Sequence, residues 1–366
     1  MTTTPSKLRT ILLFGGRSAE HEVSILSARS LANAAPRERI EIVPICIARD
    51  GRFVEPERSA RILSGEEPST NGHPSFSFET WSRAAAIDIV FPLIHGTGGE
   101  DGKLQGYLET LGLPFVGSDV TASAVGMDKV HMKQAFAAAK LPMVDYVAVL
   151  EYEWKHERER VTRALANALR LPYFVKPANS GSSVGVTKVK NDADLGAAIE
   201  HALRFDGKVL IERGVEAREI EVAVLGNDTP EASVAGEIVA GAEFYDYADK
   251  YVDSKSQLVI PAKLANDKSE EIRRLALAAF KAIGASGFAR VDFFLERGTN
   301  RLYVNEINTI PGFTNISMYP KLWEATEMKY PRLIERLITL GVERSKLRAS
   351  RAESTMKWFD EVAPLK

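Results

Sequence analysis

Residues 289–308 read ARVDFFLERGTNRLYVNEIN, and this stretch decides how the second half of the chain must be interpreted. Two strand-like runs, residues 289–295 and 302–308, flank a turn-forming segment that contains Gly298, Thr299 and Asn300. This pattern predicts an antiparallel hairpin. Because side chains alternate faces along a strand, every second residue of each run points to the same side.

Four polar side chains share one face of this predicted hairpin. Symmetric closure places Asp292 opposite Glu306 and Arg290 opposite Asn308. Two carboxylates about 4 Å apart repel each other by roughly 4 kcal/mol at an effective dielectric constant near 20, so a cation has to lie between them. Two carboxylates and an amide oxygen suit Mg²⁺ carrying nucleotide phosphates better than they suit zinc. The alternative is a solvated strand face on which Arg290 neutralises the acids.

The composition is that of a soluble protein with ordinary hydrophobic cores. A chain of 366 residues, 45% hydrophobic and 26% charged, predicts two or three globular domains. The 47 basic and 49 acidic side chains nearly cancel, which argues against nucleic acid or an anionic membrane as a partner. The single cysteine, Cys46, lies in an apolar run and indicates a buried structural thiol in a reducing compartment. With no signal-like or membrane-spanning run, we expect a cytoplasmic protein.

Strand-like runs alternate with helical patterns near the beginning of the chain, which predicts an open parallel sheet. Residues 10–14, 42–48 and 87–94 have the apolar character of buried parallel strands. Ligands gather at the carboxyl ends of such strands, so residues 15–20 and 95–102 are candidate binding turns. In the second turn, His95 is either a ligand or a hydrogen-bonded structural residue, and a lone histidine favours the structural role.

The pattern changes near residue 126, where a helix begins that Asp128 is placed to cap. Lys129 lies in the first turn of that helix, an unfavourable place for a cation unless an anion also binds there. Charged residues 151–170 predict one solvated helix. Farther on, Asp267 and Glu270 predict a capping box for a helix whose buried stripe contains Ile272, Leu275, Ala279 and Ile283.

Residues 177–185, PANSGSSVG, form the polar tip of a second predicted hairpin. Small residues there let backbone N–H groups approach phosphate oxygens, and Ser182 and Ser183 add hydroxyl donors. Lys176, at the end of the preceding strand, supplies a point charge. The alternative for a glycine-serine hairpin is a plain turn.

Two further features are consistent with a nucleotide site. Glu212, at the end of a buried strand, and Glu219 could accept hydrogen bonds from ribose hydroxyls, although solvated glutamates fit the spacing equally well. Residues 244–251, FYDYADKY, concentrate three tyrosines beside Lys250 and predict a mobile lid with aromatic anchors.

Seven runs in this order resemble the D-alanine–D-alanine ligases of the ATP-grasp superfamily, over about residues 8–340. They are FGGRSAEHEVS at 14–24, HGTGGEDGKLQG at 95–106, GMDK at 126–129, VKPANSGSSVG at 175–185, FYDYADKY at 244–251, GFARVDFF at 287–294 and NEINTIPGFT at 305–314.

The resemblance implies an α/β, three-domain ATP-grasp fold. Residues 1–125 would form a Rossmann-like domain with an open parallel sheet, and nucleotide would lie between a central subdomain (126–231) and a C-terminal subdomain (232–345). The latter would carry the lid and the metal site, followed by a basic helical tail (346–366). The implied activity is ATP-dependent joining of two D-alanines through an acyl phosphate, for peptidoglycan precursor synthesis. ATP, two Mg²⁺ ions with Mn²⁺ as an alternative, and a homodimer come with the family.

The resemblance also assigns roles to individual residues. Glu20 would hold the first substrate's ammonium with His95 nearby, and Glu20, Ser182 and Tyr251 would form a network that ties the lid to the substrate site. Arg290 and the backbone N–H of Gly312 would stabilise the oxyanion, and Ser317 and Met318 would bind the second substrate's carboxylate. The nucleotide would contact Lys129, Lys176, Ser183, Glu212, Val215, Glu219 and Lys250, and the metal ions would contact Asp292, Glu306 and Asn308.

Arg213 departs from the family pattern, because some relatives carry lysine beside the adenine. Tyr251 favours D-alanine as the second substrate, since relatives that make D-alanyl-D-lactate lack this tyrosine arrangement. The alternatives are a ligase on the same scaffold with another amino-acid or hydroxy-acid acceptor, and a nucleotide-binding regulatory protein without catalysis.

Overall fold

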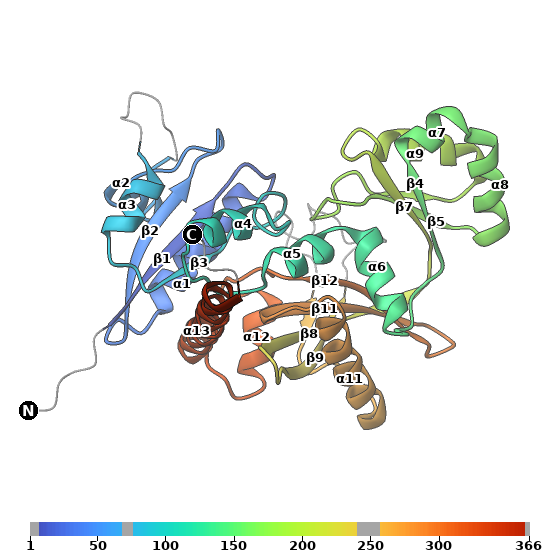
Figure 1. Ribbon diagram of the computed structural model, residues 1–366. Coiled ribbons are helices and arrows are strands. Elements are labelled where there is room, and N and C mark those ends of the chain that lie inside the picture. The colour runs from blue at the N-terminus through green and yellow to red at the C-terminus, as the bar shows by residue number, and fades with distance from the viewer. Residues whose placement is uncertain (1–6, 68–75, 240–256, 363–366) are drawn as a thin grey trace, which may run out of the picture.

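The computed structural model describes residues 7–67, 76–239 and 257–362, and within them the strands form three separate sheets (Figure 1). The first sheet lies at one end of the molecule, the five-stranded sheet lies in the middle, and the four-stranded sheet lies at the other end. This mixed α/β architecture is the predicted fold class.

The first sheet is parallel, with strand order β2-β1-β3, as the sequence predicts. Its core is the continuous apolar run of β1, in which the side chains from Ile11 to Phe14 are all fully buried. Cys46 is buried in β2, and burial raises the pKa of its thiol to about 12, which fits the predicted structural role. The elements are β1 (Leu8–Gly15), α1 (His21–Ala34), β2 (Ile40–Ile47), α2 (Pro56–Leu63), α3 (Phe78–Ala84), β3 (Ile89–Pro92) and α4 (Lys103–Thr110).

The four-stranded sheet has the order β4-β7-β5-β6 and carries the predicted polar hairpin between β5 and β6. The single helix expected over residues 151–170 is wrong. The chain forms two helices, because Glu157 adopts a non-helical φ of −131° between them, and each helix then turns its own apolar residues, Trp154 and Leu165, into the core. The elements are β4 (Tyr146–Leu150), α7 (Glu151–His156), α8 (Arg158–Ala168), β5 (Tyr173–Pro177), β6 (Thr187–Val189), a 3₁₀ turn (Asp192–Asp194), α9 (Leu195–Ala202) and β7 (Lys208–Arg213).

The five-stranded sheet is antiparallel, with the order β10-β9-β8-β11-β12, and α11 packs against it. The predicted stripe of α11 is buried, but the capping box is wrong. The helix begins at Asn266, so Asp267 lies inside the first turn and no side chain caps it. By sheet membership β8 belongs here, although it lies within residues 126–231. The elements are β8 (Ala217–Gly226), β9 (Glu231–Val239), β10 (Gln257–Val259), α11 (Asn266–Ala282), β11 (Gly287–Glu296), β12 (Leu302–Asn308) and α12 (Met318–Glu324).

Two helices, α5 (Val120–Met127) and α6 (Lys129–Ala138), connect the first sheet to the four-stranded sheet. Asp128 caps α6 as predicted, because its Oδ1 accepts hydrogen bonds from the backbone N–H groups of Val130 (3.0 Å) and His131 (3.1 Å).

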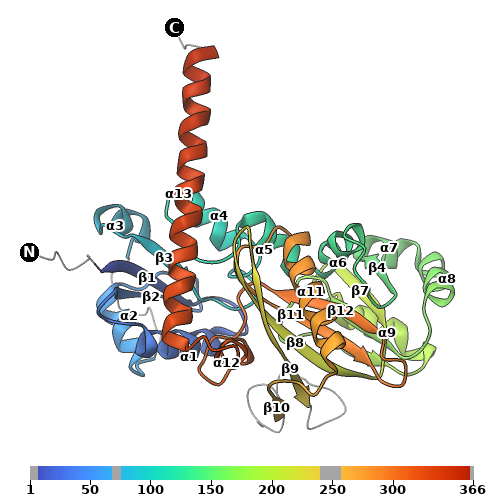
Figure 2. The same cartoon turned by 90° about the horizontal axis from the view of Figure 1, so that it is seen from below.

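The last helix, α13 (Tyr330–Val362), has two unlike halves. Its beginning is buried against the core through Leu333, Ile334, Leu337 and Ile338, whereas the rest extends away from the body of the molecule (Figure 2). None of the helices in the described ranges combines the length and apolarity needed to cross a membrane.

Candidate active site

The hairpin of β11 and β12 closes in the register that the sequence predicts. Arg290 pairs with Asn308 and Asp292 with Glu306, and a bulge follows Asp292. The amide of Asn308 donates a hydrogen bond to Asp292 Oδ2 at 3.0 Å, so the two strands also meet through these side chains. The hairpin therefore gathers two carboxylates, an amide and a guanidinium on one side of the sheet.

Arg290 is held by two acids. Its Nε and Nη2 donate to the two oxygens of Asp292 at 2.7 and 2.6 Å, and its Nε lies 3.0 Å from Glu221 Oε2 on the neighbouring strand β8. Burial alone would lower the pKa of Arg290, but the charges of Asp292 and Glu221 raise it well above its ordinary value. The guanidinium is therefore permanently charged. Arg290 neutralises the acids of the hairpin in this structure, as the alternative interpretation of the sequence expected.

The acceptor set at this place fits a hard cation that is shared with a ligand. No trio of His, Cys, Asp and Glu side chains in the described residues is arranged to hold a metal by itself. Asp292, Glu306 and Asn308 offer only oxygen acceptors, and Mg²⁺ is usually bound by one or two carboxylates together with substrate phosphates. These residues therefore fit Mg²⁺ that arrives with a nucleotide.

Two lysines face this hairpin across the site, Lys176 from β5 of the four-stranded sheet and Lys133 from helix α6. Lys176 Nζ lies 2.5 Å from Glu212 Oε2, and Lys133 Nζ lies 2.6 Å from Glu212 Oε1. Burial would raise the pKa of Glu212, but Lys133 and Lys176 together lower it to about 2. Glu306 is among the acids that raise the pKa of Lys176 against the effect of its burial, so charges of the two sheets act on one another across the space between them.

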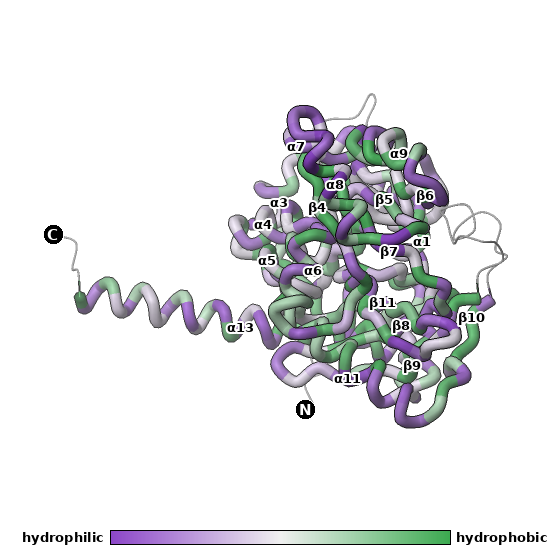
Figure 3. The backbone as a smooth tube through the Cα atoms, turned by 90° about the vertical axis from the view of Figure 1, so that its right-hand side faces the viewer, coloured by the Kyte–Doolittle hydropathy of each residue, from purple (hydrophilic) through white to green (hydrophobic). Residues whose placement is uncertain are grey.

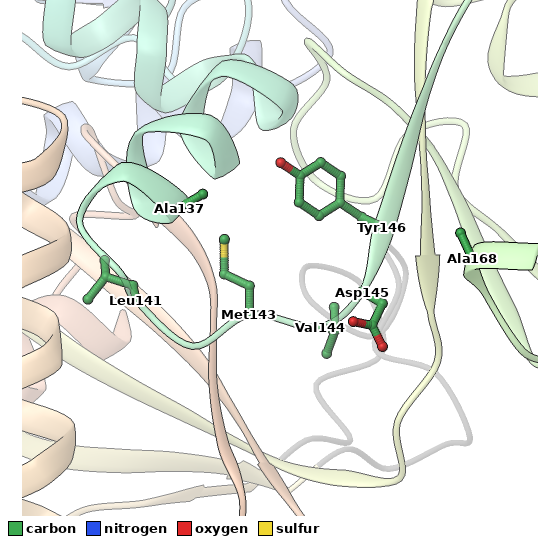
Figure 4. A pocket seen from close by; sticks show the side chains of 7 residues that line it. All are labelled: Ala137, Leu141, Met143, Val144, Asp145, Tyr146 and Ala168. Carbon is green, nitrogen blue, oxygen red and sulfur yellow. The ribbon is translucent and has the colours of Figure 1, made fainter. Parts of the chain in front are cut away.

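Lys133 is a functional residue that the sequence did not reveal. Its side chain is 1% exposed, and its ammonium also lies over the ring of Tyr146, 5.4 Å from the centroid. Tyr146 and Asp145 line a pocket of about 460 Å³ at the junction of α6 and β4 (Figure 4). The other lining residues are Ala137, Leu141, Met143, Val144 and Ala168.

Lys129 lies in the first turn of α6, as predicted. Its Nζ donates to the carbonyl of Ser180 at 2.6 Å, and its backbone N–H donates to the carbonyl of Ala178 at 3.0 Å. These bonds fasten the start of α6 to the polar tip between β5 and β6. Lys129 and Lys176 therefore both lie at the start of the loop that joins β5 to β6.

The polar tip reaches the first sheet through a contact between Ser182 and Glu20. The Ser182 hydroxyl donates to Glu20 Oε1 at 2.5 Å. Ser182 and Ser183 have φ values of 48° and 59°, left-handed conformations that turn the tip sharply. A Cβ atom added to Gly181 would stand 3.0 Å from Glu20 Oε2, so the backbone of the tip approaches this carboxylate closely. Two of the three residues of the expected network, Glu20 and Ser182, are therefore in contact. The third, Tyr251, lies outside the described residues, as does Lys250.

His95 is buried and satisfied by the protein on both sides of its ring. Its Nδ1 lies 2.9 Å from the carbonyl of Ile310 and its Nε2 lies 2.9 Å from the hydroxyl of Ser27. Burial lowers its pKa, so the imidazole is neutral, with Nδ1–H as the donor to the carbonyl. His95 is therefore a hydrogen-bonded residue inside the protein, as a structural role requires.

Glu100 lies in the predicted binding turn of residues 95–102, although the sequence did not single it out. Its two oxygens accept hydrogen bonds from the backbone N–H groups of Gly96 (2.9 Å) and Ile310 (3.1 Å). Burial and the nearby charge of Glu20 raise its pKa to about 8, so it is largely protonated at neutral pH.

The loop after β12 brings the remaining predicted residues beside Glu100. Ser317 precedes α12 and its hydroxyl accepts from the backbone N–H of Thr314 at 3.1 Å. A Cβ atom on Gly312 would stand 3.2 Å from the Ser317 hydroxyl, so these two residues are neighbours. The side chain of Met318 is buried in the core, which leaves its backbone N–H as the group that can face a ligand.

The residues expected around adenosine lie where β7 leads into β8. Val215 is half-buried in that connection, and Glu219 is one of the acids that raise the pKa of Lys176. Arg213 turns its guanidinium away, 3.4 Å from Glu296 and 3.2 Å from the Tyr303 hydroxyl. The guanidinium therefore has partners within the protein, which leaves the backbone of Arg213 as the group that can face a base. Glu212, by contrast, is occupied by two lysines rather than open to a ribose.

Two family models together match most of the chain. The model described as D-ala D-ala ligase N-terminus matches residues 9–118, and the one described as D-ala D-ala ligase C-terminus matches residues 135–339. A D-alanine--D-alanine ligase from Geobacillus thermodenitrificans is 47% identical over 352 residues, covering 92% of this chain and 96% of that protein. One from Halothermothrix orenii is 48% identical over 341 residues, covering 92% and 99%.

Solved structures agree with these matches. The D-alanine-D-alanine ligase from Coxiella burnetii has a TM-score of 0.81 and 35% sequence identity, covering 96% of this chain and 99% of that one. The D-Ala:D-Ser ligase VanG from Enterococcus faecalis has a TM-score of 0.77 and 31% identity, covering 92% and 100%.

Proposed function

The chain belongs to the D-alanine–D-alanine ligase family, and we propose that it joins two D-alanines at the expense of ATP with the residues assembled around Arg290 and Glu20. The observation that carries this proposal is the pairing of Asp292 with Glu306 and of Arg290 with Asn308. This pairing places oxygen acceptors for a divalent ion beside the charged Arg290, and they face Lys176 of the four-stranded sheet.

ATP enters between the four-stranded and five-stranded sheets. Lys129 and Lys176 contact its phosphates, Ser183 and the backbone of the tip cover them, and Val215 and Glu219 surround the adenosine. Asp292, Glu306 and Asn308 hold two Mg²⁺ ions, with Mn²⁺ as a substitute, and the ions supply neutralisation of the phosphate charge. Glu212 acts behind Lys176 and not on the ribose, because both of its oxygens lie against lysines.

The first D-alanine binds with its ammonium on Glu20, and His95 shapes this subsite from beneath. An oxygen of its carboxylate attacks the γ-phosphorus of ATP, the bond to the β-phosphate oxygen breaks, and ADP leaves. Arg290 stabilises the charge on the transferring phosphoryl group. The products of this step are ADP and D-alanyl phosphate.

The second D-alanine binds with its carboxylate at Ser317 and the backbone N–H of Met318. Its neutral amine attacks the acyl carbon, and the oxyanion that forms is stabilised by Arg290 and the N–H of Gly312. The C–O bond to phosphate then breaks, the nitrogen loses a proton, and D-alanyl-D-alanine and phosphate result. Lys250 and Tyr251, from the lid expected by resemblance, exclude water that would hydrolyse the acyl phosphate.

The same family membership supports a role in peptidoglycan precursor synthesis, a cytoplasmic location and a homodimeric assembly with no nucleic-acid or membrane partner. Domain limits near residues 125, 231 and 345 remain part of this proposal. Strand β8 is the exception to the limit at 231, because it precedes that residue but belongs to the five-stranded sheet.

The test is ADP release coupled to product identification across a panel of acceptors. With ATP and Mg²⁺, D-alanine should give ADP and D-alanyl-D-alanine in equal amounts, and D-serine, D-lactate and L-alanine should give far less. D-Serine belongs in the panel because the fold also resembles a D-Ala:D-Ser ligase. Comparable turnover with D-serine or L-alanine would defeat the assignment of the acceptor.

A further inference from the structure

The outer half of α13, from Lys346 to Val362, is exposed, and beyond Arg348 no contact with the rest of the described chain is seen. The last ion pair that we see between this helix and the body joins Arg348 to Glu109 of α4. Figure 3 shows the helix from the side, as an arm that leaves the body and alternates green and purple. Five large apolar side chains are at least half exposed along it: Leu347, Met356, Trp358, Phe359 and Val362.

An arm of this kind is not stable by itself. Isolated helices of this length are marginal in water, and helices in proteins take most of their stability from packing an apolar face. The arm has such a face, because Ala349, Ala352, Met356 and Phe359 follow one another at spacings of three, four and three residues. This is the a/d spacing of a helix that pairs with another helix.

The charges on the arm are divided along its length. Residues 344–351 contain four basic and no acidic side chains, whereas residues 352–362 contain three acidic side chains and one basic side chain. Lys357 already pairs with Glu353 at 2.8 Å, which leaves the acids at Asp360 and Glu361 near the tip. A helix that is basic near its root and acidic near its tip complements a copy of itself that runs in the opposite direction.

We propose that the outer half of α13 pairs antiparallel with the same segment of a second copy of this chain. Symmetry about residue 354 then places Ala349 against Phe359 of the second copy and Ala352 against Met356, so each small residue receives a large one. On the same flank of the stripe, Lys346 comes beside Asp360 of the second copy. Parallel pairing would instead stack Ala on Ala and Phe on Phe and place like charges together, which neither packing nor electrostatics favours.

This interface is independent of the ligase reaction, since the arm carries none of the residues assigned to it. A second copy is favoured over an unrelated protein because both the sizes and the charges of the arm match its own reversed image. The family's dimerisation, expected by resemblance, does not specify this surface.

Disulfide cross-linking tests the geometry directly, because the only native cysteine, Cys46, is buried. Ala352→Cys and Met356→Cys are made as separate full-length variants with tags of different size, mixed, and oxidised with copper phenanthroline. Ser354→Cys, on the opposite face of the same exposed stretch, is the matched control. We expect most of the mixture to become a disulfide-linked mixed dimer on non-reducing gels, and at least tenfold less cross-linking of Ser354→Cys.

Absence of the mixed dimer would overturn the proposal, as would equal cross-linking of the control, or self-linking of each variant faster than linking of the mixture. A charge exchange provides a second measurement by light scattering at low salt. Lys346→Asp and Asp360→Lys should each raise the dissociation constant of this interface by roughly tenfold, and the double variant should restore it. Unchanged D-alanine-dependent ADP release would show that the variants are folded. If the unaltered protein, the two single variants and the double variant then had the same dissociation constant for this interface, the proposal would also be overturned.

Discussion

Lys133→Met removes a buried charge that pairs with Glu212, and it should impair ATP binding. Lys133 and Lys176 share Glu212 at 2.6 and 2.5 Å. In the proposed reaction Lys176 turns to phosphate, and Lys133 then remains as the partner of the buried carboxylate. In the variant, Glu212 would be left without a partner whenever Lys176 contacts ATP.

The size of the effect follows from the charges. Against the effect of burial, the two lysines lower the pKa of Glu212 from 4.5 to about 2, which at roughly 1.4 kcal/mol per pH unit is a net contribution of about 3–4 kcal/mol to stability. That stability is present above pH 4.5 and is lost as the pH falls through 2. With Lys133 supplying half or more, its loss should lower the free energy of unfolding by about 2 kcal/mol. Leaving a buried charge unpaired in the complex costs about 3–5 kcal/mol, or roughly a hundredfold or more in the KM for ATP.

Steady-state ADP release at varied ATP, together with urea unfolding at pH 7, measures both effects. Lys268→Met is the control: Lys268 pairs with Glu271 at 2.6 Å on α11, where the pair is partly exposed, and we expect changes below about 1 kcal/mol and an unaltered KM. A Lys133→Met enzyme with the ATP affinity of the unaltered protein would refute the idea that Lys133 frees Lys176 for phosphate.

Three further outcomes are expected. Ser182→Ala removes the 2.5 Å hydrogen bond to Glu20 and should raise the KM for the first D-alanine by roughly tenfold to a hundredfold, with ATP binding little changed; equal effects on both substrates would argue against the substrate role of Glu20. The pKa of Glu100 is raised from 4.5 to about 8, so Glu100 should stabilise the fold below pH 4.5 and lose that contribution as the pH rises through 8. In Glu100→Gln, the decline in the free energy of unfolding between pH 6 and 9 should therefore be smaller by about 3 kcal/mol. Parallel pH profiles of the two proteins would contradict this. Tyr251→Phe should weaken binding of the second D-alanine more than binding of ATP, and separate titrations of each ligand would show whether the order is reversed.

The register of the catalytic hairpin could be predicted because it depends only on local rules. A short turn between two strands of alternating character fixes which residues face each other, and Asp292, Glu306, Arg290 and Asn308 pair as expected. The cap at Asp128 and the tip between β5 and β6 are local in the same sense.

The residues that the sequence did not reveal depend on contacts between distant segments. The raised pKa of Glu100 comes from its burial and from the charge of Glu20, and its carboxyl accepts a hydrogen bond from Ile310, 210 positions away, so residues next to it in sequence do not reveal this environment. Lys133 lies among apolar residues of α6, where a lysine ordinarily reaches solvent, and only the packing of β7 against that helix buries it beside Glu212. The prediction of one helix over residues 151–170 failed for a related reason. No glycine or proline marks the break at Glu157, and the chain breaks there because Trp154 and Leu165 both pack into the core.

Electron paramagnetic resonance of Mn²⁺ in the presence of ADP tests the central claim most directly, because it reads the metal site without needing turnover. The unaltered protein should bind two Mn²⁺ ions per chain with ADP and show the signal of a coupled pair, and Glu306→Gln and Asp292→Asn should each lose at least one ion while keeping the fold. If both variants bind Mn²⁺ with the stoichiometry and affinity of the unaltered protein, the hairpin is not the metal site and the account fails.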